Sequence, residues 1–246
     1  MANYLLPTWM IRLGEKVAKV PFAKRVLKPI YYPYKEWLNK KRNQKFLSNG
    51  MSVIRCFDET LTSAGIPYML GFGTLLGAVR EHGFIKHDMD IDTCLWYEDY
   101  YAKDVKGCLE RSGFKMSRCF TIDDGKCGLE TTFFKDGVGI DIFLIYPAVD
   151  RMPYTCHEWL PVKDGIMRQE SMEQYGYLIP YRLEMPYVKD LIRVDFNGIM
   201  LPIPSNYDEL LTYRYGKDYM IPNPNYVTDY KVYKCWRDKK AVLQEY

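Results

Sequence analysis

One acidic residue lies in the middle of an otherwise apolar stretch of this 246-residue chain, and it limits the folds that the chain can adopt. The stretch reads Val138-Gly-Ile-Asp-Ile-Phe-Leu-Ile145, so Asp141 has apolar neighbours on both sides. Such a run is typical of a buried strand. A carboxylate inside a core costs free energy unless a metal ion or a hydrogen-bonding partner compensates it. The stretch therefore predicts a core strand whose acid is either functional or paired.

Two more acids, Asp90 and Asp92, lie on a second predicted strand over residues 89–96. Side chains two residues apart on a strand point the same way, so these carboxylates share a face and repel each other. Their oxygens suit a shared hard cation, Mg²⁺ or Mn²⁺. With Asp141 on an adjacent strand, they predict a site for one or two such ions around a phosphoryl group. The competing interpretation places the acids on loops or in ion pairs with basic residues, for which the candidates are Arg55, Arg80 and Lys86.

A glycine-containing turn, Gly71-Phe-Gly73-Thr74, joins a short predicted strand to a predicted helix over residues 74–80. Backbone N–H groups at the start of a helix bind phosphate oxygens. The turn is not the dinucleotide-binding fingerprint, because that pattern needs a glycine where this chain has Leu76. The alternative interpretation is a tight strand-to-helix connection without a ligand.

The rest of the body alternates helical and extended segments. Apolar spacing and terminal glycines predict helices over residues 54–65, 101–113 and 205–216, the last opened by a capping box at Ser205. Alternation and turn residues predict strands over 114–122 and 129–146, joined by a turn at residues 123–125, and a hairpin over 191–203 around Asn197-Gly198. Residues 147–190 give no clear pattern. This order predicts an α+β fold in which helices flank a mixed sheet.

The charges are distributed unevenly along the chain. Residues 1–50 hold 11 Lys and Arg against 2 Asp and Glu, whereas the remaining residues hold 23 against 29. We therefore divide the chain into a basic amphipathic arm, residues 1–48, and an acidic body, residues 49–246. The arm either rests on an anionic membrane through residues 1–45 or packs its apolar side chains on the body. Its prolines are expected to break it into short pieces; they are Pro7, Pro21, Pro29 and Pro33.

The cysteines and the body's charge restrict the environment and the partners. Seven cysteines at irregular spacings, with no Cys-x-x-Cys pair, predict no disulfide framework and a reducing, cytoplasmic location. A zinc site built from Cys119, Cys127, Cys156 and His157 fits no standard spacing, so buried structural cysteines are favoured. No apolar run approaches the ~18 residues of a membrane span. The body carries no dense basic stripe, which argues against nucleic acid as a partner.

Three blocks of this sequence resemble the LicD family, which belongs to the nucleotidyltransferase superfamily related to polymerase β. The first is Gly73-Thr-Leu-Leu-Gly-Ala-Val-Arg80, and the second is His82-Gly-Phe-Ile-x-x-Asp-x-Asp-Ile-Asp92, with the third acid at Asp141. The third block runs from Pro204 to Met220. The similarity extends over about residues 50–225, and the basic arm lies outside it.

The resemblance implies a nucleotidyltransferase-like mixed sheet and a phosphotransferase activity. Members of this family take phosphocholine, or a related phospho-group, from a CDP-linked donor and place it on a hydroxyl of a cell-surface or lipid-linked glycan, releasing CMP. Metal binding and catalysis would then fall to Asp90, Asp92 and Asp141. Donor binding and charge stabilisation would fall to Gly71, Gly73, Thr74, Arg80 and Lys86. The arm would hold the enzyme at the inner membrane face, where lipid-linked glycans are built.

Two other functions share these motifs, and two positions depart from the family pattern. The alternatives are a nucleotidyltransferase that transfers NMP with release of pyrophosphate, and a non-catalytic glycan- or membrane-binding module. Phe72 stands where the family usually has glycine, and Met89 stands where it usually has aspartate. Because Met89 points to the opposite face of its strand from Asp90 and Asp92, the metal pair is expected to survive. The departures are expected to affect the choice of substrate.

Overall fold

The computed structural model describes residues 21–148, 152–223 and 233–246. Contacts divide the chain into two compact units, with the boundary between Lys45 and Phe46, and each unit is described by itself. Residues 1–20, which belong to the predicted basic arm, lie outside the described residues.

The first described element is α2 (Pro21–Ser63), a helix much longer than the sequence predicts. It continues through Pro29 and Pro33, so the expectation that prolines break this segment into short pieces is wrong for residues 21–45. A proline inside a helix removes one N–H donor and crowds the preceding turn, but the other hydrogen bonds of the helix can persist around it.

The second half of α2 belongs to the body and follows the predicted spacing. Ile54, Phe57 and Leu61 are fully buried, as their positions on one helical face require. The helix ends where its glycine predicts. Gly65 has φ +63°, and its amide donates a hydrogen bond of 3.0 Å to the carbonyl of Thr62.

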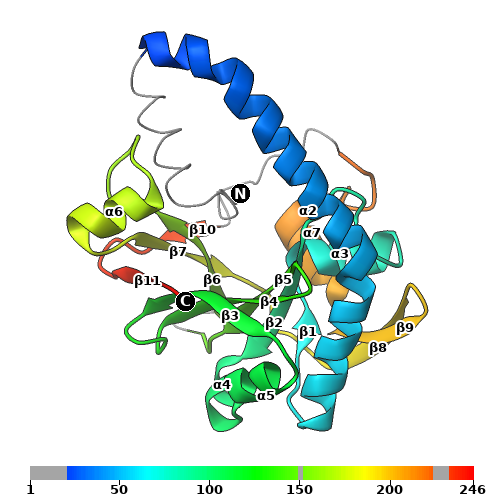
Figure 1. Cartoon of the computed structure of the whole chain (residues 1–246). Coiled ribbons are helices and arrows are strands. Elements are labelled where there is room, and N and C mark those ends of the chain that lie inside the picture. Colours follow the sequence, from blue (N-terminus) through cyan, green and yellow to red (C-terminus); the bar gives the residue numbers. More distant parts are fainter. Residues whose placement is uncertain (1–20, 149–151, 224–232) are drawn as a thin grey trace. The chain divides into compact units, whose positions relative to one another are not determined.

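A six-stranded sheet forms the centre of the body, with the strand order β1-β2-β5-β4-β3-β11. The strands are β1 (Met69–Leu70), β2 (Asp90–Trp96), β3 (Lys115–Ile122), β4 (Gly128–Lys135), β5 (Val138–Ile145) and β11 (Ala241–Glu245). β2 and β5 run parallel, and the other neighbouring pairs run antiparallel. The predicted mixed sheet is therefore confirmed (Figure 1).

The prediction of one long strand over residues 129–146 is wrong, because this segment is the hairpin β4–β5. The chain reverses at Asp136-Gly137, where φ is +51° and +81°. Two successive residues with positive φ form the tight turn that suits a two-residue hairpin, and Asp-Gly is a favoured sequence for it. The apolar residues on both sides of the turn conceal it. The same geometry confirms the predicted turn at Asn197-Gly198, where φ is +49° and +83°.

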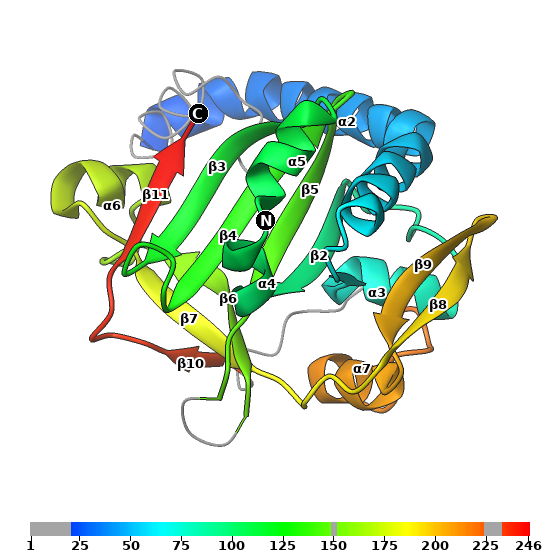
Figure 2. The same cartoon turned by 90° about the horizontal axis from the view of Figure 1, so that it is seen from below.

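Short helices flank the sheet. α3 (Phe72–Arg80) packs against β2, as expected for the helix after the glycine turn. The single helix predicted over residues 101–113 is two helices, α4 (Tyr97–Ala102) and α5 (Val105–Arg111). The break is at Lys103, which is extended, and Asp104 then caps α5 by accepting a hydrogen bond from the amide of Gly107 at 3.0 Å. Figure 2 shows α4 and α5 lying across one face of the sheet.

The segment without a sequence pattern contributes two strands of a second, three-stranded sheet with the order β10-β7-β6. Its elements are β6 (Tyr154–Leu160), α6 (Arg168–Tyr175), β7 (Ile179–Glu184) and β10 (Tyr233–Cys235). β6 contacts β4 and β5, and the buried Trp159 stacks on Phe120 of the central sheet with ring centroids 5.1 Å apart. This sheet therefore covers the face opposite α4 and α5.

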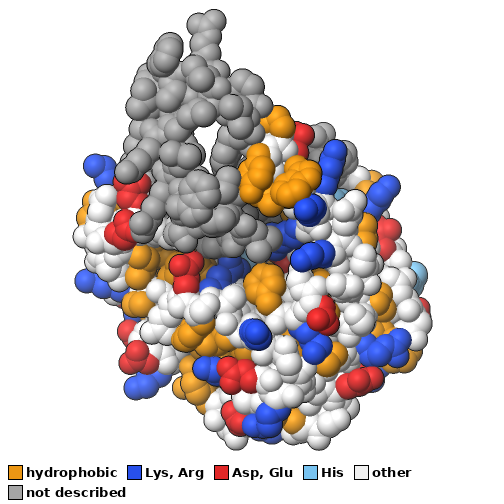
Figure 3. Space-filling view, in the orientation of Figure 1, with side chains coloured by type: hydrophobic (Ala, Val, Ile, Leu, Met, Phe, Trp, Pro, Cys, Tyr) orange, Lys and Arg blue, Asp and Glu red, His pale blue; other side chains and the backbone are white. Residues whose placement is uncertain are grey.

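A hairpin and a helix complete the body. The hairpin is β8 (Leu191–Phe196) with β9 (Ile199–Pro204), and the helix is α7 (Tyr207–Tyr215). α7 ends before Gly216, as predicted, but its N-cap is Asn206, so the capping box expected at Ser205 does not form. Over the described residues of the face drawn in Figure 3, acidic and basic side chains are interspersed.

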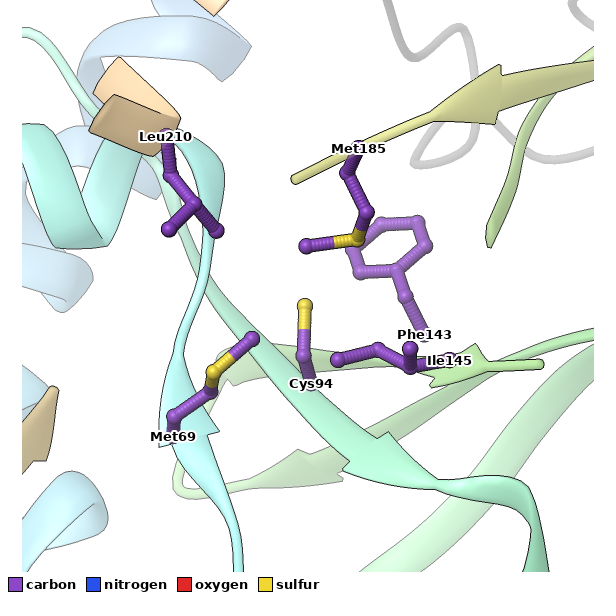
Figure 4. Packing of buried hydrophobic residues seen from close by; sticks show 6 residues of the cluster. All are labelled: Met69, Cys94, Phe143, Ile145, Met185 and Leu210. Carbon is purple, nitrogen blue, oxygen red and sulfur yellow. The ribbon is translucent and has the colours of Figure 1, made fainter. Parts of the chain in front are cut away.

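A cluster of apolar side chains fills the space between β1, β2, β5 and α7. Figure 4 shows its members converging from these elements and, for Met185, from the residue directly after β7 (Ile179–Glu184): Met69, Cys94, Phe143, Ile145, Met185 and Leu210. Cys94 follows Asp92 by two residues, and Phe143 follows Asp141 by two residues. The cluster therefore lies on the same face of the sheet as these two acids.

Candidate functional site

The three predicted acids come together on one face of the central sheet. β2 and β5 are parallel neighbours, and in their register Asp92 lies opposite Asp141 and Asp90 lies opposite Gly139. Facing residues on adjacent strands point to the same side of the sheet. Acids from two separate parts of the sequence therefore lie side by side, as the sequence predicts.

The glycine turn is hydrogen-bonded to the strand that carries the acids. The amide of Gly73 donates to Oδ2 of Asp92 at 3.2 Å, and the amide of Asp92 donates to the hydroxyl of Thr74 at 2.9 Å. The amide of Gly71 donates to the carbonyl of Asp92 at 2.9 Å. A Cβ atom on Gly73 would lie 3.4 Å from Oδ2 of Asp92 and 3.7 Å from Oδ2 of Asp88. These are ordinary van der Waals distances, so position 73 directly faces two carboxylates without requiring glycine for space.

Asp88 is a fourth acid of the site, and the sequence analysis assigned it no role. Burial, and next the charge of Asp90, raise the pKa of Asp88 to about 6. Burial also raises the pKa of Asp92 well above its usual range, with further contributions from Asp90, Asp141 and Asp88. The signal was present in the spacing, because Asp88, Asp90 and Asp92 alternate along the chain. Acids this close to one another favour either bound protons or a cation.

Asp141 is paired inside the protein, which answers the question raised by its apolar surroundings. Its Oδ1 atom accepts a hydrogen bond from the hydroxyl of Thr132, and Nη2 of Arg118 lies 3.5 Å from the same oxygen. Arg118 also lies 3.4 Å from Oε1 of Glu130. The ion pair of Asp141 is therefore with an arginine outside the predicted candidates. Finding it requires the pairing of β3 with β4 and of β4 with β5, which no local pattern specifies.

Glu130 is buried at the centre of this network. Its Oε2 atom accepts a hydrogen bond of 2.5 Å from Nε1 of Trp159. Burial raises the pKa of Glu130 to about 7, and the charge of Arg118 opposes that shift. We name Arg118, Glu130, Thr132 and Asp141 the buried acid network. It fixes the carboxylate of Asp141 from the side of β3 and β4.

The two predicted cations have different surroundings. Arg80 is the last residue of α3, and its guanidinium contacts Glu81 at 2.8 Å and the carbonyl of Tyr219 at 3.4 Å. Lys86 is exposed on the segment between α3 and β2. The structure therefore anchors Arg80 beside the end of its helix and leaves the Lys86 side chain at the surface.

Within the described part of the chain, no group of three or more His, Cys, Asp or Glu side chains is arranged as a metal-binding cluster. This holds for the acids and for the cysteines considered as zinc ligands. All seven cysteines are free thiols. The thiol of Cys156 donates to the carbonyl of Cys127 at 3.8 Å, and burial raises the pKa of both Cys119 and Cys156.

Phe72, where the sequence departs from the family pattern, has a left-handed backbone with φ +42°. This conformation disfavours a large side chain and costs roughly 1–2 kcal/mol. The ring stacks on His157, with centroids 4.3 Å apart, and meets Phe143 edge-on at 4.8 Å. These contacts offset the strain. They also place an aromatic wall directly beside the turn that holds Asp92.

Comparison with known proteins places this site within a family domain. The model of the LicD/FKTN/FKRP nucleotidyltransferase domain matches residues 65–206. The matched segment contains the glycine turn, all four acids and the buried acid network. The helices α2 and α7 and the last two strands lie outside it.

Individual relatives are distant in sequence and longer than this chain. Ribitol-5-phosphate transferase FKTN of Macaca fascicularis is 24% identical over 222 residues, which cover 89% of this chain and 44% of that protein. Ribitol 5-phosphate transferase FKRP of Mus musculus is 24% identical over 176 residues, covering 68% of this chain and 31% of that protein. The uncharacterized protein RP689 of Rickettsia prowazekii is 27% identical over 142 residues, 51% of this chain and 49% of that protein. The chain spans less than half the length of each of these relatives. The domain match covers more than half of the chain, so the protein belongs to the LicD family, a family of phosphotransferases.

Proposed function

We propose that this protein is a metal-dependent phosphotransferase. It moves a phospho-group, phosphocholine-like or related, from a CDP-linked donor to a hydroxyl of a cell-surface or lipid-linked glycan, and it releases CMP. The observation that carries the proposal is the register of β2 and β5, which sets Asp92 opposite Asp141 with Asp90 on the same face. Ribitol phosphate is the group in the names of two relatives, so CDP-ribitol is the first donor to test.

The ligand chemistry of the acids suits Mg²⁺ or Mn²⁺, although the described residues do not arrange them as a metal cluster. Burial and the neighbouring acids raise the pKa of Asp88 and Asp92, and hard oxygen ligands of this kind suit such ions. Asp90 and Asp92 would hold the ion, with Asp141 as the third carboxylate. When bound, the ion would neutralise charge on the transferred phosphoryl group.

The remaining residues orient the reactants. Thr132 and Arg118 hold Oδ1 of Asp141 and so fix the direction of its carboxylate, which is also the proposed base for the acceptor hydroxyl. Gly71, Gly73 and Thr74 hold the turn against β2, where the donor phosphates would lie. Arg80 and Lys86 would offset the negative charge of the diphosphate.

The second candidate is a nucleotidyltransferase, which the description of the matching domain favours. It would use the same acids but transfer NMP and release pyrophosphate. The leaving group separates the two reactions. Detection of CMP supports the phosphotransferase, whereas detection of pyrophosphate supports the nucleotidyltransferase.

Location and partners follow from the same proposal. We infer a cytoplasmic enzyme held at the inner membrane face by residues 1–45, acting on a glycan and not on nucleic acid. In the described part of α2, Trp37 is 47% exposed, with Nζ of Lys41 3.9 Å from its ring centroid. An exposed aromatic next to a lysine suits the headgroup region of an anionic membrane. Among the described residues, no helix is long and apolar enough to cross a membrane.

A donor screen tests the proposal. CDP-ribitol, CDP-choline, CDP-ethanolamine and CDP-glycerol are added with Mg²⁺, and the melting temperature is measured for the wild type, Asp92→Asn and a control, Asp164→Asn. Asp164 is an exposed loop residue. We expect one donor to raise the melting temperature of the wild type and the control but not of Asp92→Asn. A wild-type melting temperature that no CDP compound changes contradicts the proposal.

A further inference from the structure

Arg214 has a charged side chain whose buried atoms have no partner. It lies in the last turn of α7, and its Nε and Nη1 atoms are buried without a hydrogen bond. The guanidinium lies 4.9 Å from the ring centroid of Tyr233 and 5.6 Å from that of Tyr215. An arginine stays protonated in proteins, and ring faces do not accept its N–H groups as an oxygen does. A guanidinium in this state favours an oxyanion from outside the chain.

Other arginines near the site have protein acceptors. Arg118 pairs with Glu130 and Asp141, and Arg80 contacts Glu81 and the carbonyl of Tyr219. Arg193 is held by Asp58 at 2.6 Å. These side chains are occupied by the fold, whereas the buried nitrogens of Arg214 are not.

The surroundings of Arg214 connect it to the candidate site. It lines a cavity together with Gly71 and Phe72, which directly precede the Gly73 amide that contacts Asp92. The rest of the cavity wall is mostly apolar and includes Met69, Cys94 and Met185, which Figure 4 shows facing a common space. Among the described residues that line this cavity, Arg214 is the cation, and it shares the cavity wall with Phe72.

A second buried polar atom without a partner lies in the same neighbourhood. The Nδ1 atom of His157 is buried and makes no hydrogen bond, and its ring stacks on Phe72. Burial, followed by the charge of Arg214, lowers the pKa of His157 to about 3, so the imidazole is neutral at physiological pH. Buried polar atoms are almost always satisfied in folded proteins, so two such side chains, on α7 and β6 and both in contact with the surroundings of Phe72, suit a hydrogen-bonding ligand.

We propose that Arg214 binds a phosphate oxyanion of the substrate, with His157 as a neutral hydrogen-bonding group for the same ligand. This inference rests on the proposed function and adds to it a binding residue that neither the sequence motifs nor the acids identify. The oxyanion belongs either to the donor diphosphate or to a phosphorylated acceptor. Both present the planar array of oxygens that a guanidinium binds through two N–H groups.

Isothermal titration calorimetry tests the assignment. The probes are inorganic phosphate, CDP and glucose 6-phosphate, and the proteins are the wild type, Arg214→Gln, Arg214→Lys and the control Arg55→Gln. Arg55 is an exposed arginine of α2. We expect Arg214→Gln to weaken binding of CDP or glucose 6-phosphate by about tenfold or more, and Arg55→Gln to leave it unchanged. If Arg214→Gln weakens binding of CDP alone, the oxyanion belongs to the donor. If it weakens binding of glucose 6-phosphate alone, the oxyanion belongs to a phosphorylated acceptor.

The lysine variant keeps the test valid if Arg214→Gln does not fold, as judged by its melting temperature. Arg214→Lys keeps the charge but loses the two-pronged contact, so we expect it to bind more weakly than the wild type. Equal affinities in the wild type and the folded variants, or no phosphate binding by the wild type, overturn the inference. Turnover by Arg214→Gln with an unchanged KM for both the CDP donor and a phosphorylated acceptor overturns it while the proposed function stands. Phosphate binding that depends on Arg214, without turnover of any CDP donor, would support the binding site and contradict the proposed function.

Discussion

Phe72 shows how a single side chain can outweigh a backbone preference. Its φ of +42° suits glycine, yet the ring makes two aromatic contacts. The sequence analysis identified the position as a departure and linked it to substrate choice. The strain was not predictable, because it depends on a histidine of the second sheet, in a segment without a readable pattern.

Substitution of Phe72 separates the strain from the contacts. Phe72→Ala and Phe72→Gly both remove the ring and should both be less stable than the wild type. Elsewhere alanine is usually the more stable of the two, but here the glycine variant should exceed the alanine variant by roughly 1 kcal/mol, because only glycine adopts positive φ without strain. Urea denaturation measures the difference. An alanine variant at least as stable as the glycine variant would show that the backbone is not strained.

The pairing of strands determines the surroundings of Asp141. β5 was predicted as part of a longer strand, and its acid was correctly identified as compensated or functional. The identity of the compensating groups depends on register: Thr132 lies opposite Asp141, and Arg118 lies opposite Thr132. A shift of one residue would turn every side chain of a strand to the other face. Local sequence patterns specify which residues form strands but not this register.

Loss of Arg118 should be costly because it leaves two buried acids without their cation. We expect Arg118→Met to lower the free energy of unfolding by about 3–5 kcal/mol, and Arg118→Lys to lower it less. The exposed Arg55→Met should change it by less than about 0.5 kcal/mol. Urea denaturation at pH 7 compares the three. An Arg118→Met protein as stable as the control would mean that the buried acid network does not depend on this charge.

The same network predicts a dependence of stability on pH. Burial, opposed by Arg118, raises the folded-state pKa of Glu130 from 4.5 to about 7, so the folded state binds this proton more tightly than the unfolded state. Its contribution is therefore fully present below pH 4.5 and is lost as the pH rises towards 7. Glu130→Gln should gain on the order of 1–3 kcal/mol relative to the wild type over this interval. Denaturation curves at pH 4.5 and 7 test it, and a constant difference between the two proteins would contradict it.

Across the chain, the sequence predicted the mixed sheet, the glycine turn and the convergence of the acids. These features come from alternation, turn residues and short motifs, which act locally. The second sheet was missed because residues 147–190 show no clear alternation, and the last strand was missed because it pairs with the distant β3. The predicted breaks at the prolines are absent from residues 21–45, because a long helix can accommodate Pro29 and Pro33.

The proposed membrane contact of residues 1–45 can be tested on the full chain. Vesicles of phosphatidylcholine with and without phosphatidylserine are sedimented with the wild type, the double variant Lys40→Gln/Lys41→Gln, and Tyr175→Ala as a control from the body. Removal of two charges should weaken binding to the anionic vesicles by about tenfold or more. Tyr175→Ala, at an exposed aromatic of α6, should bind as the wild type does. Binding that is independent of lipid charge, or unaffected by the double variant, would contradict the contact.

The role of the paired acids is tested by measuring CMP release from the CDP-linked donor that the screen selects. The wild type and Asp164→Asn should release CMP when Mg²⁺ is present and stop when it is chelated. Asp92→Asn, with an intact fold by its melting temperature, should be slower by at least about a hundredfold, because it removes a charge where phosphoryl transfer needs it. CMP release by Asp92→Asn at the wild-type rate would contradict the account. So would CMP release by the wild type that continues at the same rate after Mg²⁺ is chelated.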